Sequence, residues 1–579
     1  MSLLFVIGGV AAILALAYRL YGGFLVRLFH LDPETKTPAT LLRDDIDYVP
    51  IAPHFLFGQH FSAIAAAGPI VGPIVAGVAF GWGPALAWIL IGAIFIGGVH
   101  DFTSLVASIR HQACSITEVV RLNMTRRAYL LFLGFIWIAL VYIIVAFTDI
   151  TAQSFVGKVT LEDGSVVTGA GIATSSLLYL ALPVVMGLLI RYTRLSVTRA
   201  TIIFLPLVGV AIWAGQKIPF SVESMLNVDQ ATAVKIWDVA LLSYCYFAGI
   251  VPMWMLLQPR GHLGGCFLYA AIIGAAAGLM VGGNTVQYPA FNSWSAPNGD
   301  TLFPFLFITI ACGACSGFHA IVASGTSSKQ LRSETDAKPV GYGAMLLEAL
   351  VAAVSLACVM MLAFNDPMVK KAPNFIYANG IGEFLGVFGV AKSFGISFGL
   401  LAFATFVYDT LDICTRLGRY IIEELLGWKS RMGRWTAAAI MAATPLLFVM
   451  RTETDVKGNV IPVWKAFWTL FGASNQLLAA LTLLGVTVWL VHQYRAKWIW
   501  FVMGVPTAFM YVMSVWALGL ILKARIARAG WWADAIPWVA GILILLAALM
   551  LFEAILILIR IRQNGVKGHG SPIPIQNLS

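Results

Sequence analysis

The chain has 579 residues, of which 60% are hydrophobic and only 11% are charged, and its mean hydropathy is +0.86. Soluble domains carry about 25% charged residues, so this composition excludes a soluble globular protein. The net charge of +10 does not call for a nucleic-acid partner, because membrane proteins concentrate Lys and Arg in their cytoplasmic loops. The apolar runs are continuous and do not alternate, which excludes a β-barrel and predicts an all-α polytopic membrane protein.

Apolar runs that can cross a bilayer, which takes roughly 20 residues, recur along the whole chain. The first has no Lys or Arg before Arg19 and no small-residue cleavage site, so we expect a permanent span and not a signal peptide. The polar tail, residues 562–579, is expected to be disordered. Bounded by charges or by Gly, Pro and Asn, the runs predict about 15 transmembrane helices, at residues 3–29, 54–80, 84–108, 128–150, 172–191, 199–216, 236–256, 264–283, 303–325, 340–364, 395–422, 434–450, 464–490, 498–521 and 534–560.

Lys and Arg are distributed unevenly over the predicted loops. With the N-terminus outside and the C-terminus in the cytoplasm, the cytoplasmic loops hold 24 of them and the outer loops hold 12. This bias predicts that orientation for a multi-pass protein of the cell (inner) membrane. The loop with Lys523, Arg525 and Arg528 points the wrong way, and one miscounted span near the C-terminus would explain it.

Two of the predicted spans contain residues that break helices. The second holds Gly68-Pro69 and Gly72-Pro73, and the ninth holds A-C-S-G-F-H, from Ala314, followed by S-G-T-S-S, from Ser324. Proline removes a backbone donor and glycine weakens a helix. In a membrane the freed backbone groups are tolerated only where they are buried or line a cavity. We therefore expect two discontinuous helices.

The two interrupted spans indicate an internal symmetry. They lie seven spans apart, so they run in opposite directions, and each opens a block of five spans. Such a pair is the best sequence pointer to the central site of a transporter built as an inverted repeat. We expect a five-plus-five inverted repeat with extra helices, divided into a first helix and polar loop (1–53), repeat 1 (54–216), an inserted helix pair (217–302), repeat 2 (303–490), C-terminal helices (491–561) and the tail (562–579).

Half-helix ends present positive amide and negative carbonyl poles to a substrate. The residues at the two interruptions are therefore the predicted substrate-binding residues. They are Gly68, Pro69, Gly72, Pro73, Ser316, Gly317, Ser324 and Thr326.

Seven ionisable residues fall inside predicted spans. A charge there costs at least about 2.5–3.5 kcal/mol, so each is expected to be functional or paired. All seven lie toward the predicted cytoplasmic half, which indicates a polar vestibule with titratable relays for proton coupling. They are His60, His100, Asp101, His319, Glu348, Asp409 and Asp412. Asn475 and Gln476 add uncharged hydrogen-bonding groups at membrane depth.

Other chemistries remain as alternatives to proton coupling. Imidazole and carboxylate groups also suit zinc or another divalent metal, with His60, His100, Asp101 and His319 as candidate ligands, although no cofactor is expected. Hydroxyls and carbonyls at residues 324–328 fit sodium coupling. The chain has no H-E-x-x-H motif and no G-x-x-x-x-G-K-[ST] motif, so we expect neither a zincin protease nor P-loop ATP binding. The competing class is a membrane-embedded metal-dependent enzyme or sensor, but an enzyme is not expected.

Several long motifs give the chain a family resemblance. They begin with Y-R-x-Y-G-G-F-L from Tyr18 and D-x-D-Y-V-P from Asp45, and continue with L-F-G-Q-H-F-S-A-I-A-A-A-G-P-I-V-G-P and H-D-F. C-S-G-F-H-A-I-V-A-S-G-T-S-S-K-Q-L-R-S-E-T-D-A from Cys315 follows, and G-Y-G-A-M-L-L-E, D-x-x-T-R-L-x-R and L-F-G-A-S-N-Q-L-L-A complete the series. In this order they resemble the carbon starvation protein A family of bacterial and archaeal inner-membrane transporters.

The resemblance implies a secondary uptake transporter that is induced when carbon runs low. Members are associated with peptides and, in some branches, with pyruvate taken up with protons, and the family lies near the amino acid–polyamine–organocation transporters. Where the family commonly has paired histidines, this chain has Gln59 before His60, which weakens any metal or relay role of that pair here. The many carboxylates, and the absence of a mid-span Lys or Arg, favour short peptides over pyruvate as the substrate.

Overall fold

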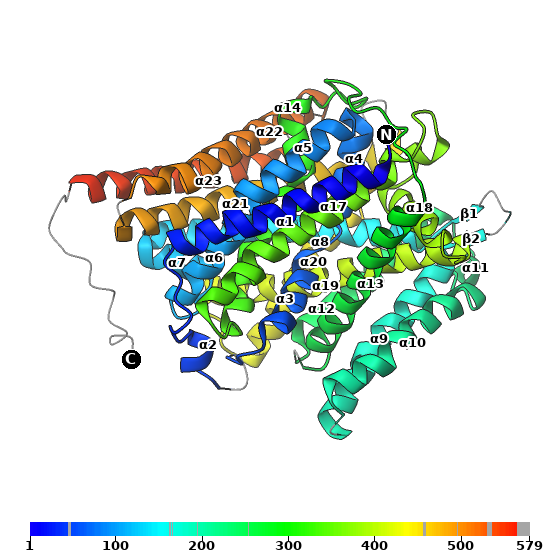
Figure 1. Cartoon of the computed structure of the whole chain (residues 1–579), viewed down its shortest axis with the longest axis horizontal. Coiled ribbons are helices and arrows are strands. Elements are labelled where there is room, and N and C mark those ends of the chain that lie inside the picture. The colour runs from blue at the N-terminus through cyan, green and yellow to red at the C-terminus, as the bar shows by residue number, and fades with distance from the viewer. Residues whose placement is uncertain are drawn as a thin grey trace.

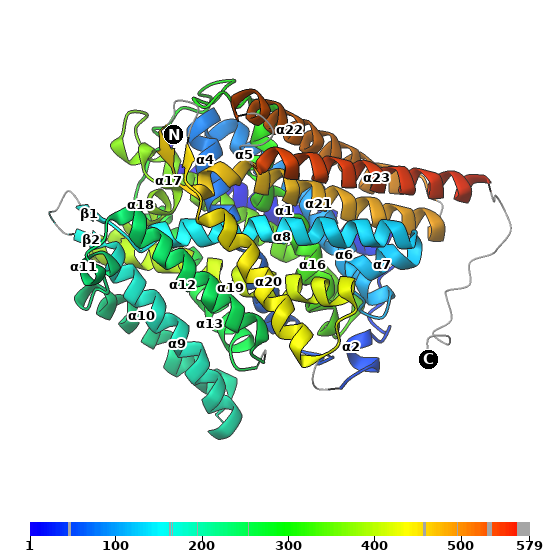
Figure 2. The same ribbon diagram turned by 180° about the vertical axis from the view of Figure 1, so that it is seen from behind.

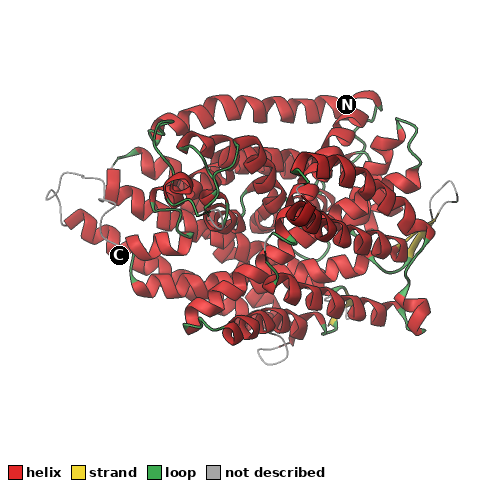
Figure 3. Ribbon diagram, turned by 90° about the horizontal axis from the view of Figure 1, so that it is seen from below, coloured by secondary structure: helices red, strands yellow, loops and turns green. Residues whose placement is uncertain are grey.

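The computed structural model describes residues 1–44, 48–160, 164, 166–193, 195–252, 254–454, 459–494, 496–529 and 535–563. Within these ranges nearly all regular structure is helical (Figure 3). The strands are two short antiparallel hairpins, β1 (Lys158–Thr160) with β2 (Val166–Thr168) and β3 (Glu453–Thr454) with β4 (Val460–Ile461). The fold class is therefore all-α and polytopic, as predicted.

Thirteen helices in the described ranges are long and apolar enough to cross a membrane, or fourteen when a bent pair is counted as one more span. The bent pair is α3 (Pro53–Ile64) and α4 (Gly68–Phe80). The thirteen comprise α1 (Leu3–Leu28), α5 (Trp82–Gly92) joined through a π-helical turn to α6 (Gly98–Arg110), α8 (Arg126–Ser154), α9 (Gly169–Thr193), α10 (Val197–Lys217), α12 (Gln230–Ile250), α13 (Leu257–Val281), α17 (Ala344–Met360) with the turns before it, α19 (Lys392–Leu426), α20 (Arg431–Val449), α21 (Val463–Tyr494), α22 (Val505–Ala529) and α23 (Ile536–Gln563).

The predicted number of about 15 differs from this count because of the second interrupted span. That span consists of α14 (Leu302–Thr309), α15 (Ala311–Ala314) and α16 (Gly317–Gly325), and no single piece is long enough to cross a bilayer. All fifteen predicted positions are occupied by helix. Both α22 and α23 are long and apolar enough to cross a membrane. The basic residues that the sequence places in a loop, Lys523, Arg525 and Arg528, lie at the end of α22, where Arg525 is 3.5 Å from Glu453 of β3.

One buried helix was not predicted. α18 (Pro373–Gly386) has 14 residues, too few to span a bilayer, and the sequence places it in a loop. It packs through small residues, because a Cβ on Gly399 of α19 would lie only 2.8 Å from Ala378, and one on Gly395 would lie equally close to Gly382. The other short helices are α2 (Pro38–Leu41), α7 (Ile116–Asn123) and α11 (Val222–Leu226).

Central and peripheral helices are clearly distinguished by their burial. The most apolar stretch of α21 is 94% buried and that of α19 is 89% buried, whereas α1 and α23 reach only 22% each. α1 and α23 lie on opposite faces of the bundle, and the hairpin of α9 and α10 forms one edge (Figures 1 and 2). α19 carries Asp409 and Asp412 and α21 carries Asn475, so these polar residues lie in the interior of the bundle.

The helix boundaries correct one expectation. The sequence places Arg260 in a loop before a span that starts at residue 264, but α13 begins at Leu257 and Arg260 lies in its first turn, fully buried. Arg260 is therefore a buried cation at the end of a span and not in mid-span. The predicted tail falls largely on residues 564–579, which lie outside the described residues, while α23 extends to Gln563.

Candidate functional site

Both predicted helix breaks are present. The chain is non-helical at residues 65–67, and α3 and α4 meet there at 49°. Pro69 stands in the first turn of α4, where the missing amide costs no hydrogen bond. In the ninth span, Cys315 and Ser316 are extended between α15 and α16. Each break thus ends one half-helix and begins another at the same depth.

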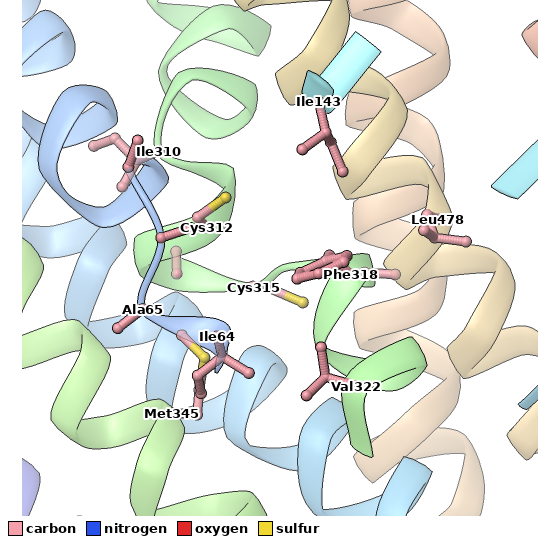
Figure 4. Close-up of a cluster of buried hydrophobic side chains, with 14 of the residues drawn as sticks. Ile64, Ala65, Ile143, Ile310, Cys312, Cys315, Phe318, Val322, Met345 and Leu478 are labelled. Carbon is pink, nitrogen blue, oxygen red and sulfur yellow. The ribbon is translucent and has the colours of Figure 1, made fainter. Parts of the chain in front are cut away.

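The two breaks lie against each other. A Cβ added to Gly68 would overlap Cys312, and one added to Gly72, a turn further on, would overlap the carbonyl of Thr309. The contacts advance along α4 while they retreat along α15 and α14, so the interrupted spans cross in antiparallel directions. Figure 4 shows Ala65 at the first break beside the segment that carries Cys312 and Cys315.

A small cavity occupies this crossing. Its volume is about 10 Å³, measured as the space open to the centre of a water-sized sphere. This is about the minimum that holds one water molecule. None of its lining residues is charged. They are Ile64 and Ala66 at the first break, Cys312, Ser316 and Phe318 at the second, Ile143 and Phe147 of α8, Thr410 of α19, and Phe471 and Asn475 of α21.

Asn475 holds the second break in place. Its side-chain oxygen accepts the Phe318 amide at 3.1 Å, and its amide group donates to the Ser316 hydroxyl at 3.0 Å. Since Asn475 and Ser316 are 1% exposed, these bonds satisfy groups that water does not reach. The sequence marks Asn475 as a polar group at membrane depth, but only the fold shows that it caps a half-helix.

Of the eight predicted substrate-binding residues, Ser316 lines the cavity. Gly68, Gly72 and Gly317 serve close packing, because Cβ atoms there would overlap neighbouring residues. Pro69 and Pro73 are buried within α4. Ser324 and Thr326 bond backbone carbonyls one turn back, at Ala320 and Val322, and Ser324 also accepts the amide of Ile116.

Four of the predicted proton-coupling residues form one buried chain. His319 Nδ1 lies 2.8 Å from Asp101 Oδ2, and its Nε2 lies 3.2 Å from Glu348 Oε2. His100 Nδ1 lies 2.7 Å from the other oxygen of Asp101. These side chains are at most 1% exposed and come from α6, α16 and α17, so the chain joins the second break to two other helices.

His60 lies apart from this chain of contacts. Its Nδ1 is 2.8 Å from the Ser327 hydroxyl, and its Nε2 has no hydrogen-bond partner among the described residues. No group of three His, Cys, Asp or Glu side chains in the described part of the molecule is arranged to hold a metal ion.

Asp409 and Asp412 meet a residue that the sequence did not single out. Arg260 Nε lies 2.7 Å from Asp409 Oδ1, and Arg260 Nη2 lies 2.5 Å from Asp412 Oδ2. The guanidinium also donates to the Tyr408 carbonyl at 3.1 Å and to the Tyr244 hydroxyl. We call Arg260, Asp409 and Asp412 the arginine cluster. Its sequence signal, an arginine close to a predicted span, is too common to identify such a site.

Comparison with known proteins gives a match over most of the chain. Residues 1–368 and 363–517 match the profile of the family described as "Carbon starvation protein CstA". The chain is 30% identical to the pyruvate/proton symporter BtsT of Escherichia coli (strain K12), over 90% of this chain and 82% of that protein. It is 32% identical to the peptide transporter CstA of Bacillus subtilis (strain 168), over 86% and 87% respectively.

Among solved structures, the fold is similar to a manganese transporter of Eremococcus coleocola, determined in complex with an aromatic bis-isothiourea substituted compound. The TM-score is 0.50 at 14% identity, and the match covers 90% of this chain and 99% of that one. At this identity the likeness concerns the fold alone.

Proposed function

Because the chain belongs to the carbon starvation protein CstA family, we propose that it is a secondary transporter that imports a small carboxylate together with protons. The observation that carries this proposal is the cavity at the crossing of the two helix breaks. Inverted-repeat transporters bind their substrates at such a place, near the bilayer midplane. The breaks and the family match point to the same function.

The half-helices at the cavity favour an anionic group. α4 and α16 both begin at the breaks, and the amides at a helix N-terminus carry a partial positive charge. Ser316 and Asn475 add hydrogen-bonding groups at the second break. A carboxylate lying between the two N-termini would meet these donors, while the apolar walls from α8 would contact a short carbon chain.

We favour pyruvate over a peptide as the substrate, because the cavity has room for about one water molecule and the smaller substrate needs the smaller expansion. A peptide's ammonium group calls for a carboxylate, and no Asp or Glu is among the cavity-lining residues. Short peptides are the second candidate, because several relatives in this family are named peptide transporters.

The buried ionisable groups support proton coupling. The histidine–carboxylate chain and the arginine cluster lie within the bundle, in the halves of their helices that the charge bias assigns to the cytoplasm. With the N-terminus outside and the C-terminus inside, protons and substrate would leave the cavity past these groups. Sodium coupling and a metal-dependent activity are the alternatives, and the uptake experiment described next distinguishes them from proton coupling.

Uptake into proteoliposomes tests the proposal. Purified protein is given labelled pyruvate or a labelled dipeptide under an inward proton gradient without sodium. We expect pyruvate to accumulate and an uncoupler to abolish the accumulation. If the dipeptide accumulates instead, the substrate is a short peptide and not pyruvate. Transport that needs sodium or added zinc would contradict proton coupling. No uptake under any of these conditions would reject the transport function.

A further inference from the structure

The arginine cluster contains more negative than positive charge. Arg260 is fully buried, and Asp409 and Asp412 are 2% and 1% exposed. One guanidinium faces two carboxylates, at 2.7 and 2.5 Å. With all three groups ionised, the cluster would carry one uncompensated negative charge inside the bundle, and such a charge is costly unless it is neutralised.

Three of the four carboxylate oxygens already accept hydrogen bonds. Asp409 Oδ1 accepts from Arg260, Asp409 Oδ2 accepts from Ser62 at 2.9 Å, and Asp412 Oδ2 accepts from Tyr244 at 3.0 Å as well as facing Arg260. Asp412 Oδ1 is buried and has no partner among the described residues. This oxygen is therefore the place where a positive charge can be added without breaking a contact.

We propose that the arginine cluster is the coupling site of the transporter, and that it takes up one proton per cycle on Asp412. Arg260 then neutralises Asp409 and leaves Asp412 as the single titrating carboxyl. A proton suits the site better than a metal ion, because a hard metal cation requires several free oxygen ligands and the cluster offers one. This inference rests on the proposed function.

The cluster is connected to both sides of the cavity. Ser62 lies on α3, three residues before the first break, and donates its hydroxyl to Asp409. Thr410, the neighbour of Asp409 on α19, lines the cavity. A proton on Asp412 weakens its attraction to Arg260 and shifts the arginine toward Asp409. The closer approach of Arg260 to Asp409 Oδ1 weakens the bond that Ser62 donates to Asp409 Oδ2. Proton binding on Asp412 thereby acts on α3, the half-helix that borders the substrate.

Other titratable groups face the two carboxylates from the helices packed around them. They set the proton affinity together with Arg260 and are themselves uncharged acids at neutral pH. They are Tyr179 of α9, Tyr244 and Cys245 of α12, and Tyr408 and Cys414 of α19. Arg260 is thus the one cation of this group, and removing it should change the coupling.

The first test compares Asp412→Asn with Asp229→Asn, an exposed position before α12 where Asn is an equally good helix cap. Each variant is reconstituted with the substrate that the wild type accumulates. With one electroneutral proton per substrate, a gradient of about one pH unit supports about tenfold accumulation. We expect Asp412→Asn to lose this accumulation but to retain exchange of labelled for unlabelled substrate, and Asp229→Asn to retain both.

Normal accumulation by Asp412→Asn would overturn the inference while leaving the proposed function intact. If the wild type itself does not accumulate any substrate, the proposed function has failed instead. Asp412→Glu keeps a titrating carboxyl and should restore part of the accumulation.

A second measurement does not depend on a variant that folds. Proton and substrate uptake by the wild type are followed in the same vesicles, with an internal pH dye and with label. One proton per substrate is expected, and two would overturn the assignment to a single carboxyl. Arg260→Gln removes the cation that favours the ionised carboxylates, so protonation, and with it exchange, should persist to a higher pH than in the wild type.

Discussion

Gly72 of α4 lies so close to Thr309 of α14 that a Cβ atom on the glycine would overlap the Thr309 carbonyl. The same Cβ atom would lie 3.2 Å from Ile310 Cα. Backbone meets backbone where the two interrupted spans cross. Glycine commonly serves this purpose in membrane helix packing. The crossing positions both half-helix N-termini at the cavity, so its geometry is a condition for the site.

Replacement of Gly72 by alanine should therefore reduce both stability and transport. Overpacking of a close-packed interior costs about 1–3 kcal/mol, and here the obstacle is backbone that cannot rotate away. Thermal unfolding in detergent and uptake in vesicles measure the two effects. Gly134→Ala on α8 is the matched control, because nothing lies within 4 Å of a Cβ at that position; an equal loss in the control would show a general effect of helix glycines.

Asn475→Ala should weaken substrate binding more than it slows turnover. The change leaves the Phe318 amide and the Ser316 hydroxyl without their side-chain partner, at a cost of about 1–3 kcal/mol for a buried donor. We expect a raised KM for uptake and a lower Tm. Ser474→Ala is the control, since its hydroxyl bonds the Phe471 carbonyl of its own helix. An unchanged KM in Asn475→Ala would remove Asn475 from the site.

The variant Glu348→Gln distinguishes the role of the histidine–carboxylate chain in transport from the role of the arginine cluster. Glu348 lies 3.2 Å from His319, which extends from the second break, so replacing its carboxyl group by an amide should alter this link and slow transport. If Asp412 alone carries the coupled proton, the final accumulation ratio stays at the wild-type value although the rate falls. Uptake followed to its plateau distinguishes the two quantities, and a lowered plateau would place coupling in the histidine chain as well.

Arg110→Ala should open the side of the bundle that is predicted to face the cytoplasm. Arg110 lies 3.3 Å from Glu334 and donates to the Phe29 carbonyl at 2.8 Å and to the Tyr494 hydroxyl at 2.9 Å. It thereby ties together segments that follow α1, α6, α16 and α21. Loss of these bonds should favour conformations in which the cavity is open on that side.

Cys114, in the loop after α6, provides the measurement. Burial raises the pKa of its thiol, and Glu118 adds to the effect, so the reactive thiolate is scarce at neutral pH and labelling speeds up as the pH rises. In Arg110→Ala we expect faster maleimide labelling at neutral pH and a labelling curve shifted to lower pH, because the thiol becomes hydrated. Identical curves for variant and wild type would show that Arg110 does not hold this side closed.

The match to the carbon starvation protein CstA family confirms the resemblance that the sequence motifs predict. The two discontinuous helices also follow from local chemistry, because Gly-Pro pairs and a run of small and hydroxyl residues break a helix wherever they occur. α18 could not be predicted in this way, since its 14 residues are shorter than a span and its place depends on packing against α4, α13, α17 and α19.

The sequence by itself determined the membrane environment, the positions of the spans, the two breaks and seven of the buried ionisable residues, since these depend on hydropathy and on local backbone chemistry. Only the tertiary structure decided which of those residues meet. It gives His60 a contact with Ser327 and joins His319 to Asp101 and Glu348. It also brings Arg260 to Asp409, 149 residues further along the chain, and to Asp412. Such pairings depend on how helices far apart in the sequence pack against one another, and no local pattern records that.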